Sequence, residues 1–195
     1  MLHAMRAVDR VSFIPPESRW AAYIDEAVDI GRGQTCSQPS MVAFMLDKLE
    51  LKRGLKVLEV GAGSGYAAAI IALLCSPGGR VLAAEILPEL AAAARANCAV
   101  ALAGRAAAAG LLEIIEADAS AGLPSEAPFD RILLSAGVSR PGFREEPLLA
   151  QLAEEGTLLY PEARGRIYKL RRRGRDLVRE SWGSVAFVRL VGNNS

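Results

Sequence analysis

Apolar runs and alanine-rich segments of helical character alternate along the middle of the chain. Apolar runs bounded by turn residues predict buried strands at residues 55–61, 79–85, 111–118, 129–137 and 156–161. Between them, apolar spacing predicts helices at residues 66–75, 88–103 and 144–155, and a further helix runs from Pro39 to a stop near Gly54. Strands that alternate with helices predict a doubly wound α/β domain with a mostly parallel sheet.

The two ends of the chain have different patterns. Residues 1–36 are expected to be irregular or weakly helical, with a break at Pro15 and Pro16. Residues 166–182 predict a hairpin that turns near Gly174, and residues 184–191 predict a final strand. These C-terminal strands are expected to form an antiparallel addition at one edge of the sheet.

Composition narrows the classes of function. The 23 basic and 22 acidic residues leave a net charge of +1, which provides no overall field for nucleic acid or an anionic membrane. Three widely spaced cysteines fit neither a disulfide framework nor a Cys-x-x-Cys zinc motif, so no metal site is expected. We expect no secretory signal and no membrane span, and a reducing cytoplasm fits the cysteine usage.

The segment VLEVGAGSGY places Gly61, Gly63 and Gly65 directly between a predicted strand and a predicted helix. Glycine allows a tight turn there and lets a ligand approach the main chain closely. A glycine pattern of this kind also occurs for structural reasons alone, so its meaning depends on the residues around it.

Acidic side chains gather at the same end of successive predicted strands. Glu59 lies just before the glycine turn, Glu85 ends the second of these strands and Asp118 ends the third. A carboxylate at Glu85 can accept hydrogen bonds from two ribose hydroxyls, and one at Asp118 can accept from an adenine amino group. These acids repel a pyrophosphate and suit a positively charged cofactor, which favours S-adenosyl-L-methionine over a nicotinamide dinucleotide.

Several segments together resemble the protein-L-isoaspartate O-methyltransferase family of class I methyltransferases. They are VDRVSFIPP, IGRGQTCSQP, VLEVGAGSGY, EILPELAAAAR, APFDRILLSAG and the closing DLVRE and VAFVRLV. The Gly-Gln-Thr-x-Ser-Gln-Pro piece is the most specific, whereas many methyltransferases share the glycine turn. The resemblance implies a seven-stranded sheet with an unusual order of its last strands, and a monomer that methylates the free carboxylate of L-isoaspartyl residues in damaged proteins. S-adenosyl-L-homocysteine is then the product of the cofactor.

The resemblance also implies the site. It places Ser37 at the position of the family's active-site serine, within a loop that covers the cofactor. The cofactor-binding residues are predicted to be Thr35, Cys36, Ser37, Glu59, Gly61, Ala62, Gly63, Gly65, Glu85, Ile86, Asp118 and Ala119. We expect one domain over residues 1–195, in which residues 1–54 cover the substrate and cofactor and residues 55–195 form the cofactor-binding core.

The single histidine, His3, is poorly placed to activate Ser37 as in a Ser-His-Asp hydrolase. A carboxylate acceptor is already ionised at neutral pH, so it needs alignment and no general base. We therefore interpret Ser37 as a hydrogen-bond donor that orients the acceptor. The alternative is that Ser37 caps the helix after Pro39. Cys36 is interpreted as a small apolar filler.

Departures from the family pattern keep other acceptors open. The segment before AMRAVDR is shorter than in relatives, Arg32 stands where many relatives have histidine, and the loops LSAGVSRPG and EEGTLLYPEARG differ. The alternatives are a methyltransferase of the same fold with another carboxylate acceptor, or a divergent module that binds the cofactor without transfer. The basic residues 169–175 are interpreted as a solvated hairpin tip, and no nucleic-acid partner is expected.

Overall fold

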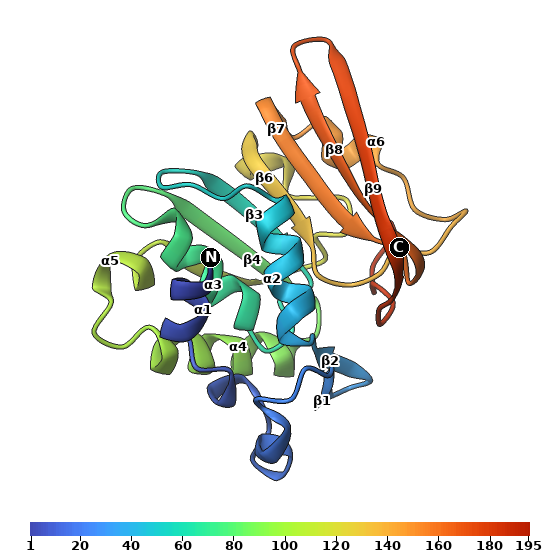
Figure 1. Cartoon of the computed structure of the whole chain (residues 1–195). Coiled ribbons are helices and arrows are strands. Elements are labelled where there is room, and N and C mark those ends of the chain that lie inside the picture. Colours follow the sequence, from blue (N-terminus) through green and yellow to red (C-terminus); the bar gives the residue numbers. More distant parts are fainter.

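The computed structural model describes all 195 residues, and a seven-stranded sheet of order β5-β4-β3-β6-β7-β8-β9 forms its centre (Figure 1). Five strands pair in parallel: β3 (Lys56–Val60), β4 (Arg80–Glu85), β5 (Leu112–Glu116), β6 (Phe129–Leu134) and β7 (Leu152–Pro161). The hairpin of β8 (Arg164–Arg173) and β9 (Asp176–Ala186) adds to β7 antiparallel. The predicted fold class is therefore confirmed.

The order of the strands reverses at β3, which lies between β4 and β6. Ligands of open α/β sheets bind beyond the carboxyl ends of the strands at such a switch point. From β6 onward the strands follow one another across the sheet in chain order, β6-β7-β8-β9. The carboxyl ends of β3, β4 and β6 are thus brought together from distant parts of the sequence.

Helices gather on one face of the sheet. They are α1 (Leu2–Ala7), α2 (Pro39–Lys48), α3 (Tyr66–Cys75), α4 (Pro88–Ala101) and α5 (Ala106–Ala109). Their buried side chains form one core cluster with strand residues such as Val57 and Val81. The helix predicted at residues 66–75 is confirmed, and Pro88 opens α4 as expected because its missing N–H needs no partner there.

The opposite face of the sheet has less helical cover. Leu58, Ile132 and Leu158 point into a second core cluster, which is closed by α6 (Glu146–Leu149), loop residues and Leu190 from the C-terminal segment. The short 3₁₀ helix η3 (Pro124–Glu126) lies in one of the connections. Neighbouring strand residues point to opposite faces, so Glu59 lies on the helical face together with Val57. Each fully buried leucine or isoleucine contributes about 1.5–3 kcal/mol to folding.

The N-terminal segment differs in part from the prediction. Two 3₁₀ helices, η1 (Arg10–Phe13) and η2 (Pro16–Ala21), match weak helical character, but β1 (Val28–Gly31) and β2 (Gln34–Cys36) form an antiparallel hairpin that the sequence did not indicate. Its turn places Arg32 at φ 58° and Gly33 at φ 70°. Such turns usually carry Asn or Gly at the first position, so an arginine there hides the signal.

Three predicted boundaries are wrong. The helix after Pro39 ends at Lys48, because Glu50 adopts φ 54° and its carboxylate pairs with Lys169, well before Gly54. The helix predicted at residues 144–155 shrinks to α6, since residues 152–155 already belong to β7. The final strand predicted at residues 184–191 is the end of β9 followed by an extended segment, which bridges to the main sheet region at Gly137 and Arg189.

Candidate active site

The glycine turn after β3 can be built only from glycine at its key positions. Gly61, Gly63 and Gly65 have φ values of 81°, 55° and 91°, which side chains rarely tolerate. A Cβ on Gly65 would lie 2.7 Å from the Cys98 sulfur, and one on Gly63 would lie 3.3 Å from Ile30 Cδ1. The turn therefore brings bare backbone to the surface of a cleft, and the tip of β1 packs over it.

Glu85 is locked at the end of β4 beside this turn. Its side chain is buried, and its two oxygens accept hydrogen bonds from the backbone N–H groups of Gly63 (2.8 Å) and Leu87 (3.0 Å). A carboxylate has about four lone-pair sites, so two acceptor positions remain for hydroxyl groups of a ligand. This geometry suits a ribose held edge-on to the strand end.

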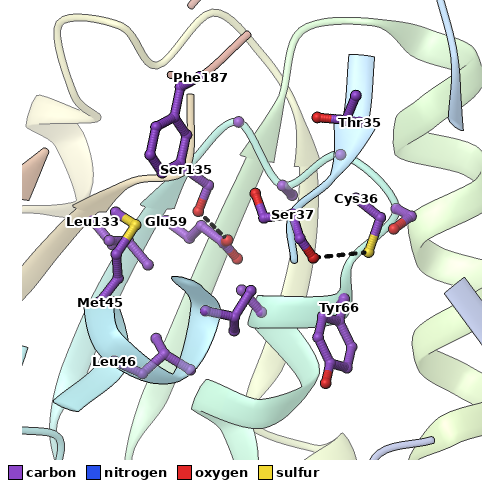
Figure 2. A pocket seen from close by; sticks show the side chains of 16 residues that line it. Thr35, Cys36, Ser37, Met45, Leu46, Glu59, Tyr66, Leu133, Ser135 and Phe187 are labelled. Carbon is purple, nitrogen blue, oxygen red and sulfur yellow. Dashed lines mark hydrogen bonds between the residues drawn. The ribbon is translucent and has the colours of Figure 1, made fainter. Parts of the chain in front are cut away.

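Glu59 is the most unusual group in the cleft. It is fully buried, and Oε1 accepts a hydrogen bond from Ser135 Oγ at 2.6 Å, while Oε2 has no partner in the chain (Figure 2). Burial raises the pKa of Glu59 to about 8, against the hydrogen bond from Ser135, and repulsion from Glu85 adds to the rise. An unpartnered buried carboxylate oxygen calls for a cation or a donor, and the ammonium group of S-adenosyl-L-methionine fits it.

The cleft consists of two adjoining hollows that share Thr35, Gly61, Gly63 and Ser135. The first is lined by Cys36, Ser37, Glu59, Ala62 and Phe187, and the second by Glu85, Ile86 and Ala119, among other residues. Figure 2 shows Ser37, Glu59 and Ser135 around the first hollow. Ten of the twelve predicted cofactor residues thus border one continuous cleft, all but Gly65 and Asp118.

Gly65 and Asp118 lie beside the cleft rather than in its wall. Gly65 precedes the first residue of α3 and lets that helix pack against α4. The Asp118 carboxylate accepts hydrogen bonds from the backbone N–H groups of Ser120 and Asn193, each at 2.9 Å. Burial opposes these bonds, but together they hold the pKa of Asp118 below its ordinary value. Asp118 thereby ties the C-terminal segment to the end of β5, and its contact with adenine stays a prediction.

Ser37 follows β2 directly, and its hydrogen bonds within the chain are made by the carbonyl oxygen and not by the hydroxyl. The residue that caps α2 is Gln38, and Asp25 accepts the hydrogen bond from the backbone N–H of Ser40 at 2.8 Å. The alternative interpretation of Ser37 as the helix cap is therefore wrong. The hydroxyl lines both the cleft and a neighbouring surface groove, which leaves it available to a ligand.

Arg10 holds the Ser37 loop in place, a role that the sequence did not reveal. Its guanidinium is buried and donates to the carbonyl oxygens of Ala22, Glu26, Cys36 and Ser37 at 2.8–3.1 Å, with longer bonds to Ala21 and Ile24. A guanidinium has five N–H donors in one plane, so one side chain can join several chain segments. Arg10 is a positioning residue for the loop.

Two further polar features have structural roles. Arg32 pairs with Glu89 at 2.6 Å, and both side chains are 59% exposed, so its charge is directed to the surface. Within the basic residues 169–175, Lys169 is buried against Glu50 and Arg172 donates to the carbonyls of Leu149 and Leu152. Only Arg173 and Arg175 fit the predicted solvated hairpin tip.

The cysteines are buried thiols, and none forms a disulfide. Burial raises the pKa of Cys75 and of Cys98 to about 12 and also raises the pKa of Cys36. Cys36 packs in the helical-face core, as expected for an apolar filler. No group of three or more His, Cys, Asp or Glu side chains is arranged to hold a metal ion, and no helix is both long and apolar enough to cross a membrane.

Comparison with known proteins identifies the family of the chain. The family model for protein-L-isoaspartate(D-aspartate) O-methyltransferase matches residues 1–195. The chain belongs to the protein-L-isoaspartate O-methyltransferase family. A relative from Aeropyrum pernix is 45% identical over 83% of this chain, and one from Methanopyrus kandleri is 41% identical over 97%. The matches span 59% and 82% of these two relatives, respectively.

A family member of known structure shares the architecture. The Plasmodium falciparum protein-L-isoaspartate O-methyltransferase, solved in complex with S-adenosyl-L-homocysteine, superposes with a TM-score of 0.81 at 25% identity, over 97% of this chain and 88% of its own. The family fold is therefore present, with a seven-stranded sheet whose last strands are antiparallel. The cleft with Glu59, Glu85 and the glycine turn lies at the switch point of that fold.

Proposed function

We propose that this chain transfers a methyl group from S-adenosyl-L-methionine to the free α-carboxylate of L-isoaspartyl residues in peptides and proteins. The observation that carries the proposal is the position of Ser37. Its unpartnered hydroxyl stands where the cofactor cleft meets a surface groove lined by residues such as Gln38, Met41 and Val185. Membership of the family supports the acceptor. The backbone amide nitrogen can attack the ester and expel methanol to close a succinimide, and hydrolysis of that ring returns part of the product to aspartate.

Three features of the chain hold the cofactor in this proposal. Glu85 accepts hydrogen bonds from the ribose hydroxyls, Glu59 Oε2 accepts one from the ammonium group, and the backbone of the glycine turn allows close approach. When bound, S-adenosyl-L-methionine supplies an electrophilic methyl group on a sulfonium sulfur. The buried pair of Glu59 and Ser135 favours this cation and disfavours anionic ligands.

Ser37 orients the acceptor. Its hydroxyl donates a hydrogen bond to one oxygen of the carboxylate, which leaves the second oxygen free to attack. The acceptor needs no base because it is ionised, and fixed alignment of reacting groups can supply about 7–11 kcal/mol of rate enhancement. Arg10 contributes indirectly, since it fixes the neighbouring carbonyl oxygens of Cys36 and Ser37 and thereby the backbone that carries the Ser37 hydroxyl.

The N-terminal segment excludes water from the site. Ile30 near the tip of β1 lies against Gly63 of the glycine turn, and Thr35 and Cys36 of β2 line the cleft. In the proposal, residues 1–54 act as a cover and residues 55–195 as the cofactor-binding core of one domain. Ala4 and Met45 share a core cluster with strand residues, which supports a cover that is firmly attached.

The proposal also includes a monomer that works on polypeptides and has no nucleic-acid substrate. The absence of a nucleic-acid substrate is supported by the pairing of Lys169, Arg171 and Arg172 within the chain, because little of the basic cluster is left for phosphate groups. A reducing cytoplasm is the proposed location, and the buried, unpaired thiols support it.

The test is transfer of labelled methyl groups to two peptides that differ only in L-isoaspartate or L-aspartate at one position. The proposal expects base-labile label on the isoaspartyl peptide alone. Label on both peptides, or on the aspartyl peptide alone, would show another carboxylate acceptor. Absence of label from both peptides, with S-adenosyl-L-homocysteine binding intact by calorimetry, would contradict the proposed activity and leave the cofactor site standing.

A further inference from the structure

A second groove, of about 670 Å³, lies next to the proposed acceptor position. It is lined by Val138, Ser139, Arg140, Glu162, Ala163, Arg164, Phe187 and Arg189. Phe187 also lines the cofactor cleft, and Ala163, Arg164 and Phe187 also line the groove that contains Ser37. A peptide that presents a residue to Ser37 can therefore extend into this second groove.

The groove has more positive than negative charge left unpaired. Arg140 pairs with Glu145 at 2.9 Å and with Glu162 at 3.2 Å, so both acids near the groove are already engaged. Glu145 also pairs with Arg179, and Glu162 accepts a hydrogen bond from the backbone N–H of Arg166. Arg164 and Arg189 are exposed and make no side-chain hydrogen bond or ion pair with the chain. Two guanidinium groups thus face the groove without a partner.

The backbones that carry these two arginines are fixed. Arg164 begins β8 and pairs with Ala186 of β9, and Arg189 forms a bridge with Gly137 just beyond β6. Phe187 lines the same groove and adds an apolar surface to its wall. Two arginines with a fixed backbone and unpaired guanidinium groups suit the recognition of a carboxylate. A guanidinium binds a carboxylate through two parallel N–H donors.

We propose that Arg164 and Arg189 form a subsite for an acidic side chain, aspartate or glutamate, that flanks the isoaspartyl residue of the substrate. The inference rests on the proposed function, because it takes Ser37 as the acceptor position. A peptide is favoured over a nucleic acid because the groove joins the acceptor groove and has Phe187 in its wall, while the chain as a whole is nearly neutral.

The test uses isoaspartyl peptides with Glu, Gln or Lys at the flanking positions, one position at a time. We expect kcat/KM to be roughly two- to fivefold higher for Glu than for Gln at one position, which is the range of an exposed ion pair, and lowest for Lys. The difference should arise in KM and shrink at high salt, because exposed charges are screened. In the double variant R164Q/R189Q the ratio of Glu to Gln should fall to one.

Arg173→Gln is the matched control, since Arg173 is also exposed and lies at the other end of the same strand. It should keep the wild-type ratio. Binding of the same fluorescently labelled peptides in the presence of S-adenosyl-L-homocysteine gives a second readout that does not require catalysis, and it should show the same order.

Equal binding and equal kcat/KM for the Glu and Gln peptides would overturn the subsite. If methyl transfer to the Gln peptide remained efficient, the proposed function would stand without it. If no peptide were methylated, the proposed function would fail, and the binding order alone would decide the subsite. A third result would also overturn the acidic subsite and indicate a phosphate site. It is binding of a short single-stranded RNA that R164Q/R189Q abolishes, together with no effect of peptide charge on methyl transfer.

Discussion

Glu59 is a carboxyl group that the folded chain keeps away from water and from any cation of its own. Its pKa of about 8 means that the folded chain retains a proton which the unfolded chain releases above about pH 4.5. The stability that the protonated group contributes is therefore complete below pH 4.5 and is lost as the pH rises to 8, by about 1.4 kcal/mol per pH unit.

Glu59→Gln should remove this pH dependence because an amide does not ionise. The free energy of unfolding of the variant, measured by urea denaturation, should gain on the wild type by about 1.4 kcal/mol per pH unit between pH 5 and 8. Glu154→Gln serves as the control, since Glu154 is exposed and forms no ion pair. A constant difference between wild type and Glu59→Gln across this range would show that Glu59 is ionised in the folded chain.

The sequence could predict the site residues whose role depends on their place at the end of a strand or the start of a helix. The glycine turn, Glu59 and Glu85 follow from the end of a strand and the start of a helix. Ser135 follows β6 in the same way and could have been found by the same rule. Arg10 could not, because its partners lie 11 to 27 residues away along an irregular segment with no period.

At the scale of elements, the β1–β2 hairpin depends on Arg10 for its attachment. Arg10→Gln removes most donors to carbonyl oxygens that stay buried, and an unsatisfied buried polar group costs about 1–3 kcal/mol. We expect the variant to lose about 2–4 kcal/mol of unfolding free energy and to lose methyl transfer with it. Urea denaturation measures the first, and proteolysis should show early cleavage within residues 21–37.

Arg6→Gln is the control for that experiment, because Arg6 is an exposed arginine in the preceding helix. It should leave both the unfolding midpoint and the cleavage pattern at wild-type values. An Arg10→Gln variant as stable as the wild type would mean that the hairpin is held by its own packing rather than by the guanidinium.

Elements with an uninterrupted pattern were predictable, and elements set by distant contacts were not. The strand β4 and helix α3 have continuous apolar sequence and were found almost to the residue. The segment after α6 has leucines at helical spacing, but Leu152 pairs with Phe129 of β6 and becomes strand. Pairing with the neighbouring strand β6 decides the conformation of this segment, and the local sequence does not indicate which strand it will pair with.

At the scale of the molecule, the cofactor cleft joins segments from most of the sequence, so ligand binding should stabilise the whole fold. S-adenosyl-L-homocysteine at a hundred times its Kd should add about 2.7 kcal/mol, which corresponds to a rise in Tm of roughly 5–10 °C. ATP at the same concentration should give no rise, because the Glu85 carboxylate beside the glycine turn opposes its phosphates. A thermal scan measures both, and an equal shift with ATP would contradict the charge argument.

The sheet as a whole was predictable in class and not in detail. Alternating strands and helices gave the parallel core, and the last strands gave the antiparallel edge. The uneven cover of the two faces depends on loops, α6 and the C-terminal segment, whose Leu190 and Asn193 reach back to the core and to Asp118. Such closure is a product of packing between distant segments and leaves no periodic signal in the sequence.

The most direct test of the account is the effect of Ser37→Ala on two quantities: kcat with an isoaspartyl peptide and the Kd of S-adenosyl-L-homocysteine. The Ser37 hydroxyl donates to the acceptor in this account, while the contact of this residue with Arg10 is made by its backbone carbonyl, which alanine keeps. Loss of a hydrogen bond to a charged group predicts a kcat lower by roughly 10- to 100-fold, with the Kd within about twofold of wild type. An unchanged kcat, or an equal loss in both quantities, would contradict the assignment of Ser37 as the residue that orients the carboxylate.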